Sequence, residues 1–369
     1  MLSSKIIPTC FSGIVGALEF TPDGTQLAVG DSDGIKMVST ESWETVKNRP
    51  FPDHHPIKIN NLRSIKFSPC GKYMTDGPNE NIFEIYGNLC NPLDNTTTVE
   101  TRHCHKHVRH SFSPCGNYLI FIYTVPMVLY KTRYGGWHRH SVLINVGNDI
   151  IDVIWGEHAI VCLNKSGIVN ILSPSDFSIL KTLTVCLNVN GQYVIALSKN
   201  YLVVHRYTSF ESFNGFYVFN TKNWLCCHYY NTQNNICNMR FSPDGRYLVA
   251  STENGIIDVW STTNSLKWGF QFLKTIKSTT YQMGKTVPIA ISDKYIACGE
   301  SSHVRLWNLL NWSDRINSEF NNNVQSIVFY IMCLFDQCYF ADVCIEMLLE
   351  MLEYSFMIMG ISCKENLHL

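Results

Sequence analysis

One short turn motif recurs along the chain and constrains its fold more than any other feature. It is an aromatic residue followed by Ser or Thr, Pro, Asp or Cys, and Gly, and it occurs at Phe20–Gly24, Phe67–Gly71, Phe112–Gly116 and Phe241–Gly245. Proline presets φ at the second position of such a turn, and glycine accepts the left-handed conformation that closes a hairpin. Because short apolar runs flank the copies, we predict a β-hairpin at each one.

The spacing of the motif predicts further units that lack it. Phe112 and Phe241 are 129 residues apart, which is three steps of 43. Candidate markers for the two hidden units are Trp155 and Leu197, each followed by an apolar strand, and Ile291 marks a seventh unit. The successive spacings are 47, 45, 43, 42, 44 and 50 residues. One repeated supersecondary unit is the simplest explanation.

Each unit contains more than one hairpin. Asn254-Gly255 is the signal of a two-residue hairpin loop in which both residues accept positive φ. A third strand follows, as in Ile256–Trp260, and then a weaker fourth strand, as in Ser178–Leu183. No helical period is found before Phe320, so the chain is predicted to be all-β.

With these features the sequence resembles the WD-repeat β-propeller family. The resemblance rests on the unit length, the four strands and Asp258-Val259-Trp260 at the end of a third strand, with Arg305–Asn308 at the matching place in the last unit. It covers about Gly13–Phe320 and implies a propeller of about seven four-stranded antiparallel blades. The Ser-Pro-Asp-Gly hairpin also occurs in other propeller families, including those related to prolyl oligopeptidase and TolB.

An eighth unit begins but does not continue. Asn321–Phe329 resembles Asn60–Phe67, yet no turn motif follows and the repeat character ends. The apolar tail that follows carries one acidic stripe at helical spacing, formed by Asp342, Glu346, Glu350 and Glu353. Two interpretations of this tail remain open. It is either a helix that docks on the propeller or on a partner, or the product of alternative splicing or a mispredicted gene end. We therefore expect three parts: an N-terminal segment over 1–13, a propeller over 14–323 and a divergent tail over 324–369. Either the N-terminal segment or residues 324–329 could pair with the last blade.

Composition excludes several classes of function. The formal net charge is −1 and only 16% of residues are charged, so there is no broad basic surface for direct nucleic-acid binding. The 15 cysteines form no regular framework and the first ten residues lack a signal sequence, which is typical of reduced thiols in an intracellular protein. We expect the cytoplasm, with the nucleus as the alternative. No apolar run is long enough to span a membrane.

Motifs for chemistry are absent or incomplete. Gly284-Lys285-Thr286 lacks the earlier glycine of a phosphate-binding loop. His103, His105 and His107 would lie in a row along an extended segment, and a row does not converge on one tetrahedral zinc ion. A metal site, a partner-binding surface and a solvated loop all remain open there, the last being favoured. We expect no catalytic residue, no metal site and no cofactor.

The resemblance implies where partners would bind. In the family, the loops that precede the first strand and those between the second and third strands form the usual binding face. Carried onto this chain, the expected partner-binding residues are Asp31, Asp33, His54, His55, Arg102, His105, Lys106, His107, Glu253, Asn254 and His303.

The expected function is a non-catalytic scaffold for protein–protein interactions. Its partners would be proteins or peptides, and the chain would be a monomeric propeller within a larger assembly. The alternatives are a propeller of a translation-initiation-factor-like assembly protein and a catalytic or ligand-binding propeller of another family.

Overall fold

The structure is a computed structural model, and it describes part of the chain. The described residues are 4–7, 14–31, 33–50, 64–76, 82–87, 96–100, 109–122, 127–133, 136–144, 146, 149–185, 192–207, 215–232, 235–262, 270–278 and 287–309. The predicted tail over 324–369 therefore lies outside the described residues.

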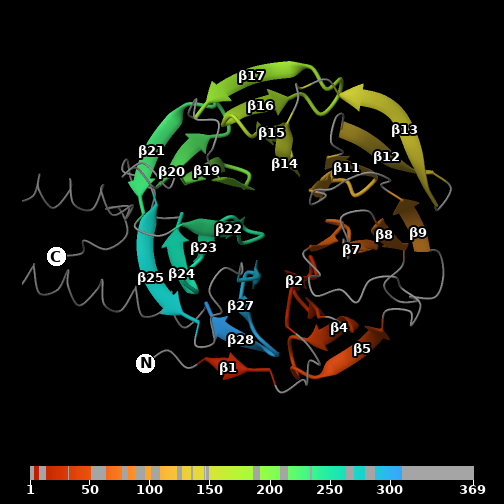
Figure 1. The fold of residues 1–369 in the computed structure, drawn as a ribbon, viewed down its shortest axis with the longest axis vertical. Helices are drawn as coiled ribbons and strands as arrows, with labels where there is room; N and C mark the ends of the chain where they lie inside the picture. The colour runs from red at the N-terminus through yellow and green to blue at the C-terminus, as the bar shows by residue number, and fades with distance from the viewer. Residues whose placement is uncertain are drawn as a thin grey trace, which may run out of the picture.

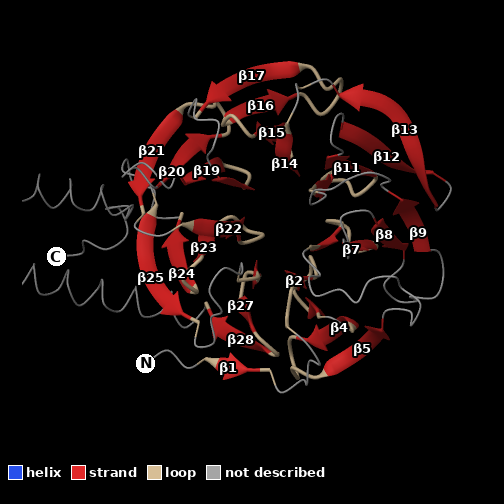
Figure 2. Ribbon diagram, in the orientation of Figure 1, coloured by secondary structure: helices blue, strands red, loops and turns tan. Residues whose placement is uncertain are grey.

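Seven four-stranded antiparallel sheets form a ring, in chain order, and these sheets are the predicted propeller blades (Figure 1). Every described element is a strand or a loop (Figure 2). Blade 1 consists of β2 (Ala17–Phe20), β3 (Gln26–Gly30), β4 (Gly34–Ser39) and β5 (Thr45–Pro50). Blade 2 consists of β6 (Ile65–Phe67), β7 (Tyr73–Asp76), β8 (Ile82–Gly87) and β9 (Thr96–Glu100). Blade 3 consists of β10 (His110–Phe112), β11 (Tyr118–Ile122), β12 (Met127–Arg133) and β13 (Gly136–Ile144).

Blades 4 and 5 are the two units that were inferred from spacing alone. They consist of β14 (Ile150–Trp155), β15 (Ile160–Asn164), β16 (Ile168–Leu172) and β17 (Ile179–Thr184); and of β18 (Gln192–Leu197), β19 (Tyr201–Tyr207), β20 (Gly215–Asn220) and β21 (Cys226–Asn231). Blade 6 consists of β22 (Ile236–Phe241), β23 (Tyr247–Thr252), β24 (Ile256–Ser261) and β25 (Gln271–Lys277). The predicted fold class, an all-β propeller, is confirmed.

Blade 7 is completed by the start of the chain. Its sheet contains β26 (Ile289–Ile291), β27 (Tyr295–Glu300) and β28 (His303–Asn308), and the fourth strand is β1 (Lys5–Ile6). β1 pairs antiparallel with β28, with Lys5 opposite Leu306. Ile7, which is 1% exposed, donates its amide to the Val304 carbonyl at 2.9 Å and lies in the apolar cluster between blades 7 and 1. The N-terminal segment therefore closes the ring.

The repeated turn motif owes its shape to a hydroxyl group. In blade 6, Ser242 Oγ accepts the Tyr247 amide at 3.0 Å and donates to Asp244 Oδ1 at 2.6 Å. Gly245 has φ 71° and donates its amide to the Ser242 carbonyl at 2.8 Å. In blade 3, Cys115 replaces the aspartate, and its Sγ lies 3.3 Å from the serine hydroxyl. The motif therefore tolerates cysteine, because Ser113 Oγ still accepts the Tyr118 amide at 3.0 Å.

The second turn of the opening unit differs from its prediction. β23 ends at Thr252 and β24 begins at Ile256, so the loop contains three residues. Gly255 has φ 70°, whereas Asn254 is absent from the positive-φ residues. The expectation of a two-residue loop with both residues at positive φ was wrong. The Thr252 side chain causes the difference, because its Oγ1 accepts the Ile256 amide at 3.2 Å and holds the wider turn.

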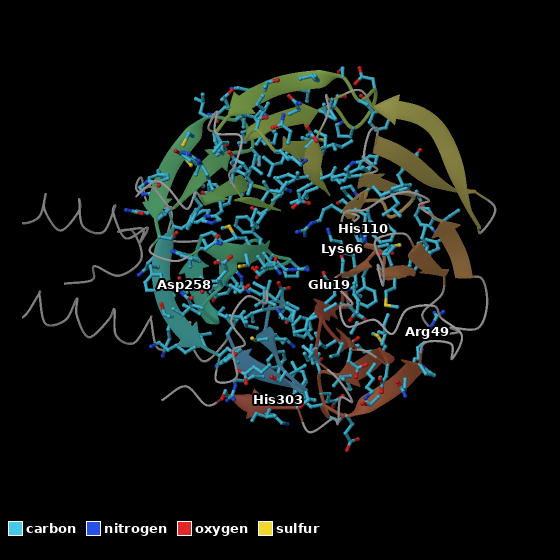
Figure 3. All side chains as sticks on the ribbon, viewed as in Figure 1. Glu19, Arg49, Lys66, His110, Asp258 and His303 are labelled. Carbon is cyan, nitrogen blue, oxygen red and sulfur yellow. The ribbon has the colours of Figure 1, made fainter. Side chains whose placement is uncertain are left out.

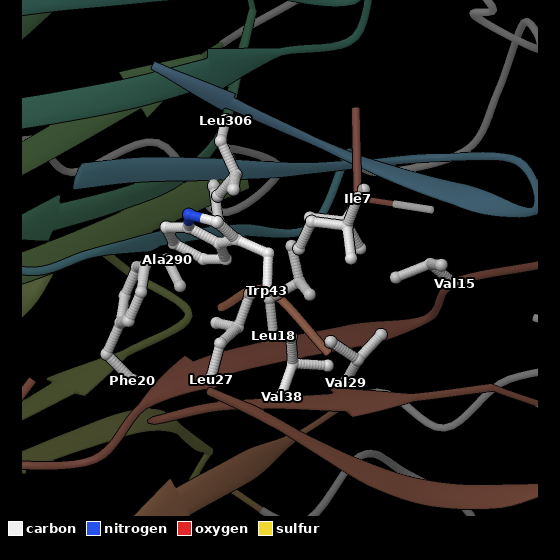
Figure 4. Close-up of a cluster of buried hydrophobic side chains, with 12 residues drawn as sticks. Ile7, Val15, Leu18, Phe20, Leu27, Val29, Val38, Trp43, Ala290 and Leu306 are labelled. Carbon is white, nitrogen blue, oxygen red and sulfur yellow. The ribbon is translucent and has the colours of Figure 1, made fainter. Parts of the chain in front are cut away.

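Aromatic side chains join neighbouring blades around the ring. Trp43, from the turn after β4, meets Tyr295 of blade 7 edge to face with ring centroids 5.0 Å apart. Trp137 of blade 3 contacts Tyr73 of blade 2 at 5.1 Å. Phe270, beside β25 of blade 6, contacts Tyr201 of blade 5 at 5.0 Å. In each case an outer aromatic residue packs on the tyrosine that starts the second strand of the preceding blade, and Figure 4 shows Trp43 within such an interface.

Candidate protein-binding face

The chain presents two kinds of connection at one end of its sheets. In an antiparallel meander, the segment that leads into the first strand and the turn between the second and third strands lie at the same end. The other two turns of each blade lie at the opposite end. We call the first end the loop face. It carries the turns at which partner-binding residues were predicted.

Side-chain oxygens at the end of the second strand hold these turns in shape. Asp31 Oδ1 accepts two amides of its own turn, at 2.9 and 3.1 Å. Asn164 Oδ1 does the same in blade 4, at 3.0 and 2.8 Å, and Thr252 Oγ1 accepts one amide in blade 6. Such bonds give a loop a defined conformation before it meets a partner.

The turn of blade 7 carries a network of charged groups. The Glu300 side chain is buried, and Arg305 Nε donates to both of its carboxylate oxygens at 3.0 Å. His303 Nε2 lies 3.0 Å from Glu300 Oε2 and is half-buried (Figure 3). Arg305 Nη1 also donates to Ser4 Oγ at 3.0 Å, so the network links the turn to the segment that closes the ring. The Arg305 Nε–H is shared between the two oxygens, and a hydrogen bond between oppositely charged groups is stronger than one between neutral groups.

The described predicted residues all lie at the loop face, four of them on turns and His303 as the first residue of β28. Asp33 and Asn254 are exposed, and Glu253 and His303 are half-buried. Asp31 is only 1% exposed, so its observed role is to shape its turn. Partner contact stays a prediction for the whole set. The others lie outside the described residues: His54, His55, Arg102, His105, Lys106 and His107.

A second group of charged residues lies on or directly before the innermost strands, and the sequence reasoning missed it. We call it the axial cluster, and its members are Glu19 on β2, Lys66 on β6, Arg109 before β10, Asp152 on β14 and Arg240 on β22. Figure 3 shows Glu19 and Lys66 directed toward the centre of the ring.

An ion pair within the axial cluster joins two blades that are not neighbours. Arg240 Nη1 of blade 6 donates to Glu19 Oε2 of blade 1. Blade 7 lies between them, and it has Ala290 at the equivalent position of its inner strand. Ala290 carries no charge of its own, so the charged groups that flank blade 7 pair with each other. A usable signal was present in the sequence, because Glu19, Lys66 and Arg240 each stand one residue before a phase marker.

Lys66 interacts electrostatically with all four other members of the axial cluster. Its Nζ donates to the His110 carbonyl oxygen at 2.7 Å. Burial lowers the pKa of Lys66 to about 8, since a low-dielectric environment disfavours the charged form. Asp152 and Glu19 oppose this shift, whereas Arg240 and Arg109 add to it. No salt bridge to Lys66 is found within the described part of the chain.

A buried histidine connects blades 5 and 6. His205 is 0% exposed, its Nδ1 lies 2.9 Å from the Gly215 carbonyl oxygen, and its Nε2 accepts the Ile236 amide at 3.2 Å. These two bonds require the neutral ring with its proton on Nδ1. Burial lowers the pKa of His205 to about 4, although its hydrogen bonds with Gly215 and Asn235 act in the opposite direction. His205 is therefore a structural group and not part of the surface.

The described ranges hold neither a cluster of metal ligands nor a membrane-spanning helix. In these ranges no three His, Cys, Asp or Glu side chains gather where a metal ion could bind. The same residues contain no helix of the length and apolarity needed to cross a bilayer.

Comparisons with known proteins agree with the geometry. Residues 223–261 match the sequence model of the WD domain, G-beta repeat. Protein HIR1 of Chaetomium globosum is 26% identical over 153 residues, which is 39% of this chain and 13% of the relative. Protein hir-1 of Neurospora crassa is 24% identical over 173 residues, or 45% of this chain and 14% of the relative. The chain thus matches only a small part of the curated relatives' length.

Solved structures share the fold of the described residues. The structure of U3-55K has a TM-score of 0.62 and 12% identity, covering 83% of this chain and 98% of that one. The crystal structure of the RRP9 WD40 repeats has a TM-score of 0.64 and 12% identity, covering 83% and 97%. At this identity the likeness concerns the fold alone.

Proposed function

The chain is a WD-repeat β-propeller with divergent repeats, and from that premise we propose that it is a non-catalytic scaffold that binds protein partners through its loop face. The observation that carries the proposal is the set of preformed polar turns at this face. Their carboxylate, amide and hydroxyl oxygens already hold the backbone. Because these turns are already ordered, little conformational entropy is lost when a partner binds them, and this favours affinity.

The ring supports this role by fixing the turns relative to one another. Apolar clusters fill the interfaces between blades, and aromatic contacts cross several of them. Close-packed interiors transmit little deformation, so turns from different blades form one rigid surface. We propose Asp33, Glu253, Asn254 and His303 as contact residues, because the side chains are exposed or half-buried.

A paired-variant capture experiment tests the scaffold. His303→Ala combined with Asn254→Ala alters the loop face, whereas Glu41→Ala combined with Lys222→Ala alters exposed residues of the opposite end. Each full-length chain is used for proximity labelling and mass spectrometry in the source cell. We expect specific partners to be lost with the first pair and retained with the second. An unchanged set of partners for the loop-face pair would contradict this role for the face.

We also propose the cytoplasm as the compartment, with the nucleus as the alternative. The support is the thiol chemistry, because Cys298 is buried as a thiol and burial raises its pKa, which keeps it protonated and unreactive. Imaging of a fluorescent fusion in the source cell tests this assignment. A signal confined to a secretory compartment would contradict it.

A further inference from the structure

We propose that the axial cluster is a binding site for an oxyanion that a protein partner carries on one side chain, either a carboxylate or the phosphate of a phosphorylated residue. Lys66 is the central residue of this site, with Arg109 and Arg240 as supporting cations. The part of the proposal that concerns a protein partner rests on the proposed function, whereas oxyanion binding itself does not.

The first argument is the unused hydrogen-bonding capacity of Lys66. A lysine ammonium group has three N–H donors, and the Lys66 side chain makes one hydrogen bond, to the neutral carbonyl oxygen of His110 at 2.7 Å. Within the described residues it makes no ion pair. Two donors on a desolvated positive charge are therefore available to a ligand, and an oxyanion satisfies both charge and donors.

The second argument is the balance of charge. The cluster has three cations, Lys66, Arg109 and Arg240, against two acids, Glu19 and Asp152. Glu19 is already engaged by Arg240, and Asp152 Oδ1 accepts the amide of Val153 at 2.9 Å. Both acids are thus partly satisfied within the protein, while the positive charge at Lys66 is not. The cluster as a whole attracts an anion rather than a cation.

The third argument is access from the loop face. The Lys66 ammonium bonds to His110, which is the first residue of its strand and so lies at the loop-face end of β10. The exposed Arg109 immediately precedes it. Solvent also reaches the cluster, since the side chains of Arg240 and Glu19 are 26% and 23% exposed. A side chain from a partner bound on the loop face would therefore meet Arg109 first and Lys66 behind it.

The test follows the charge of Lys66 directly. Lysines of the full chain are labelled biosynthetically with ¹³C at Cε, which leaves all three N–H donors in place, and the Lys66 resonance is identified by its loss in Lys66→Met. We expect this resonance to titrate near pH 8 in the unliganded protein. Saturating Gly-Glu-Gly or Gly-phosphoserine-Gly should raise the midpoint by about one pH unit or more, because an adjacent anion favours the charged form. Gly-Gln-Gly should leave the midpoint unchanged, and all three peptides carry an acetylated N-terminus and an amidated C-terminus so that the central side chain is the only oxyanion.

Affinity measurements provide the matched control. Lys66→Met should weaken binding of the active peptide about tenfold or more, because a charged hydrogen bond is lost. Lys274→Met, which changes an exposed lysine of β25, should leave the affinity unchanged. Binding by wild type should also weaken about tenfold between roughly pH 7 and pH 9 as Lys66 loses its proton.

Each outcome decides a separate point. A shift with only one of the two anionic peptides supports the site and identifies the source of the oxyanion. No shift with either peptide, or an equal shift with Gly-Gln-Gly, overturns the proposal. If Lys66→Met does not fold, Lys66→Arg, which keeps the positive charge, assigns the resonance instead. Because no cellular partner is needed, a positive titration together with a failed capture experiment would refute the scaffold and retain the oxyanion site.

Discussion

Single buried side chains make the stability of this ring depend on pH, and His205 is the clearest example. Its ring accepts an amide from β22 of blade 6 while its other nitrogen bonds within blade 5. Protonation of Nε2 would remove the acceptor for the Ile236 amide and leave a charge at a site with 0% exposure. The same residue thus makes one interface between blades dependent on pH.

We predict that His205 destabilises the fold under acid conditions. Its pKa is about 4 in the folded chain against 6.5 for an ordinary histidine, so the unfolded chain binds the proton more tightly. Stability is complete above pH 6.5 and is lost as the pH falls toward 4, by up to about 3 kcal/mol at roughly 1.36 kcal/mol per pKa unit. Urea unfolding of wild type and His205→Gln across this window measures the effect.

The comparison between the two proteins isolates the histidine. His205→Gln should be less stable near pH 7 but should show a shallower loss between pH 6.5 and pH 4. His158→Gln changes an exposed histidine and should keep the wild-type slope. Parallel curves for wild type and His205→Gln would contradict the prediction.

The axial cluster shows why residue-scale chemistry was harder to predict than the fold. Glu19 and Arg240 are 221 residues apart in sequence, and they meet only because closure of the ring brings blades 6 and 1 to either side of blade 7. Their shared phase within the repeat was visible in the sequence, but the distance across the ring was not. The residues predicted on turns were easier to place, because each turn is local and its position follows from the repeat.

Individual strands and turns followed the repeat closely. Blades 4 and 5 lack the full motif, and the shared period located them because the ring requires elements of similar size in every blade. The loop at Asn254 was mispredicted, since a two-residue and a three-residue loop share the Asn-Gly signal. The Thr252 hydroxyl, which selects the longer loop, is a side-chain effect that the signal does not contain.

At the turn between the third and fourth strands, bulky residues occupy a conformation that favours glycine. Trp43, Phe177 and Trp224 have φ values of 62°, 60° and 55°. Each donates its amide to the carbonyl oxygen four residues earlier, at 2.9, 3.0 and 2.7 Å respectively. Left-handed backbone costs about 1–2 kcal/mol for an ordinary residue, so packing must offset that cost. The rings do pack, since Trp43 is only 6% exposed between blades 1 and 7.

We predict an unusual order of stability at Trp43. Trp43→Ala should destabilise the chain by about 3–5 kcal/mol, because a large buried ring is removed. Trp43→Gly should cost roughly 1 kcal/mol less than alanine, since glycine relieves the left-handed backbone. Urea unfolding of both variants measures the difference. Val46→Ala, at an exposed residue of the same blade, is the control, and alanine proving the milder substitution at position 43 would contradict the prediction.

The whole molecule depends on one short strand. β1 covers the edge of β28, and Ile7 beside it is buried in the cluster that joins blades 7 and 1. Without β1, β28 would present unpaired backbone groups, and an open edge of this kind promotes self-association. Closure therefore protects the molecule as well as stabilising it.

We predict that deletion of residues 1–7 lowers the midpoint of thermal unfolding and produces oligomers. Loss of Ile7 alone should cost about 2–5 kcal/mol, the usual range for a buried isoleucine. Scanning calorimetry and size-exclusion chromatography measure the two effects, and a synthetic peptide of residues 1–9 should reverse both. Lys5→Ala keeps the backbone pairing and serves as the control. A truncated chain that stays monomeric with the wild-type midpoint would show that closure by β1 is dispensable.

The position of β1 also delays closure of the ring during protein synthesis. Ser4 and Arg305, which bond to each other in the closed ring, are 301 residues apart in the chain. A ribosome that adds about 5–20 residues per second would leave the first strand waiting roughly 15–60 seconds for its partner. During that interval a chaperone or a binding protein would find residues 4–7 unpaired. Once the ring has closed, their backbone is committed to blade 7, so newly made and mature molecules present different N-terminal segments to the cell.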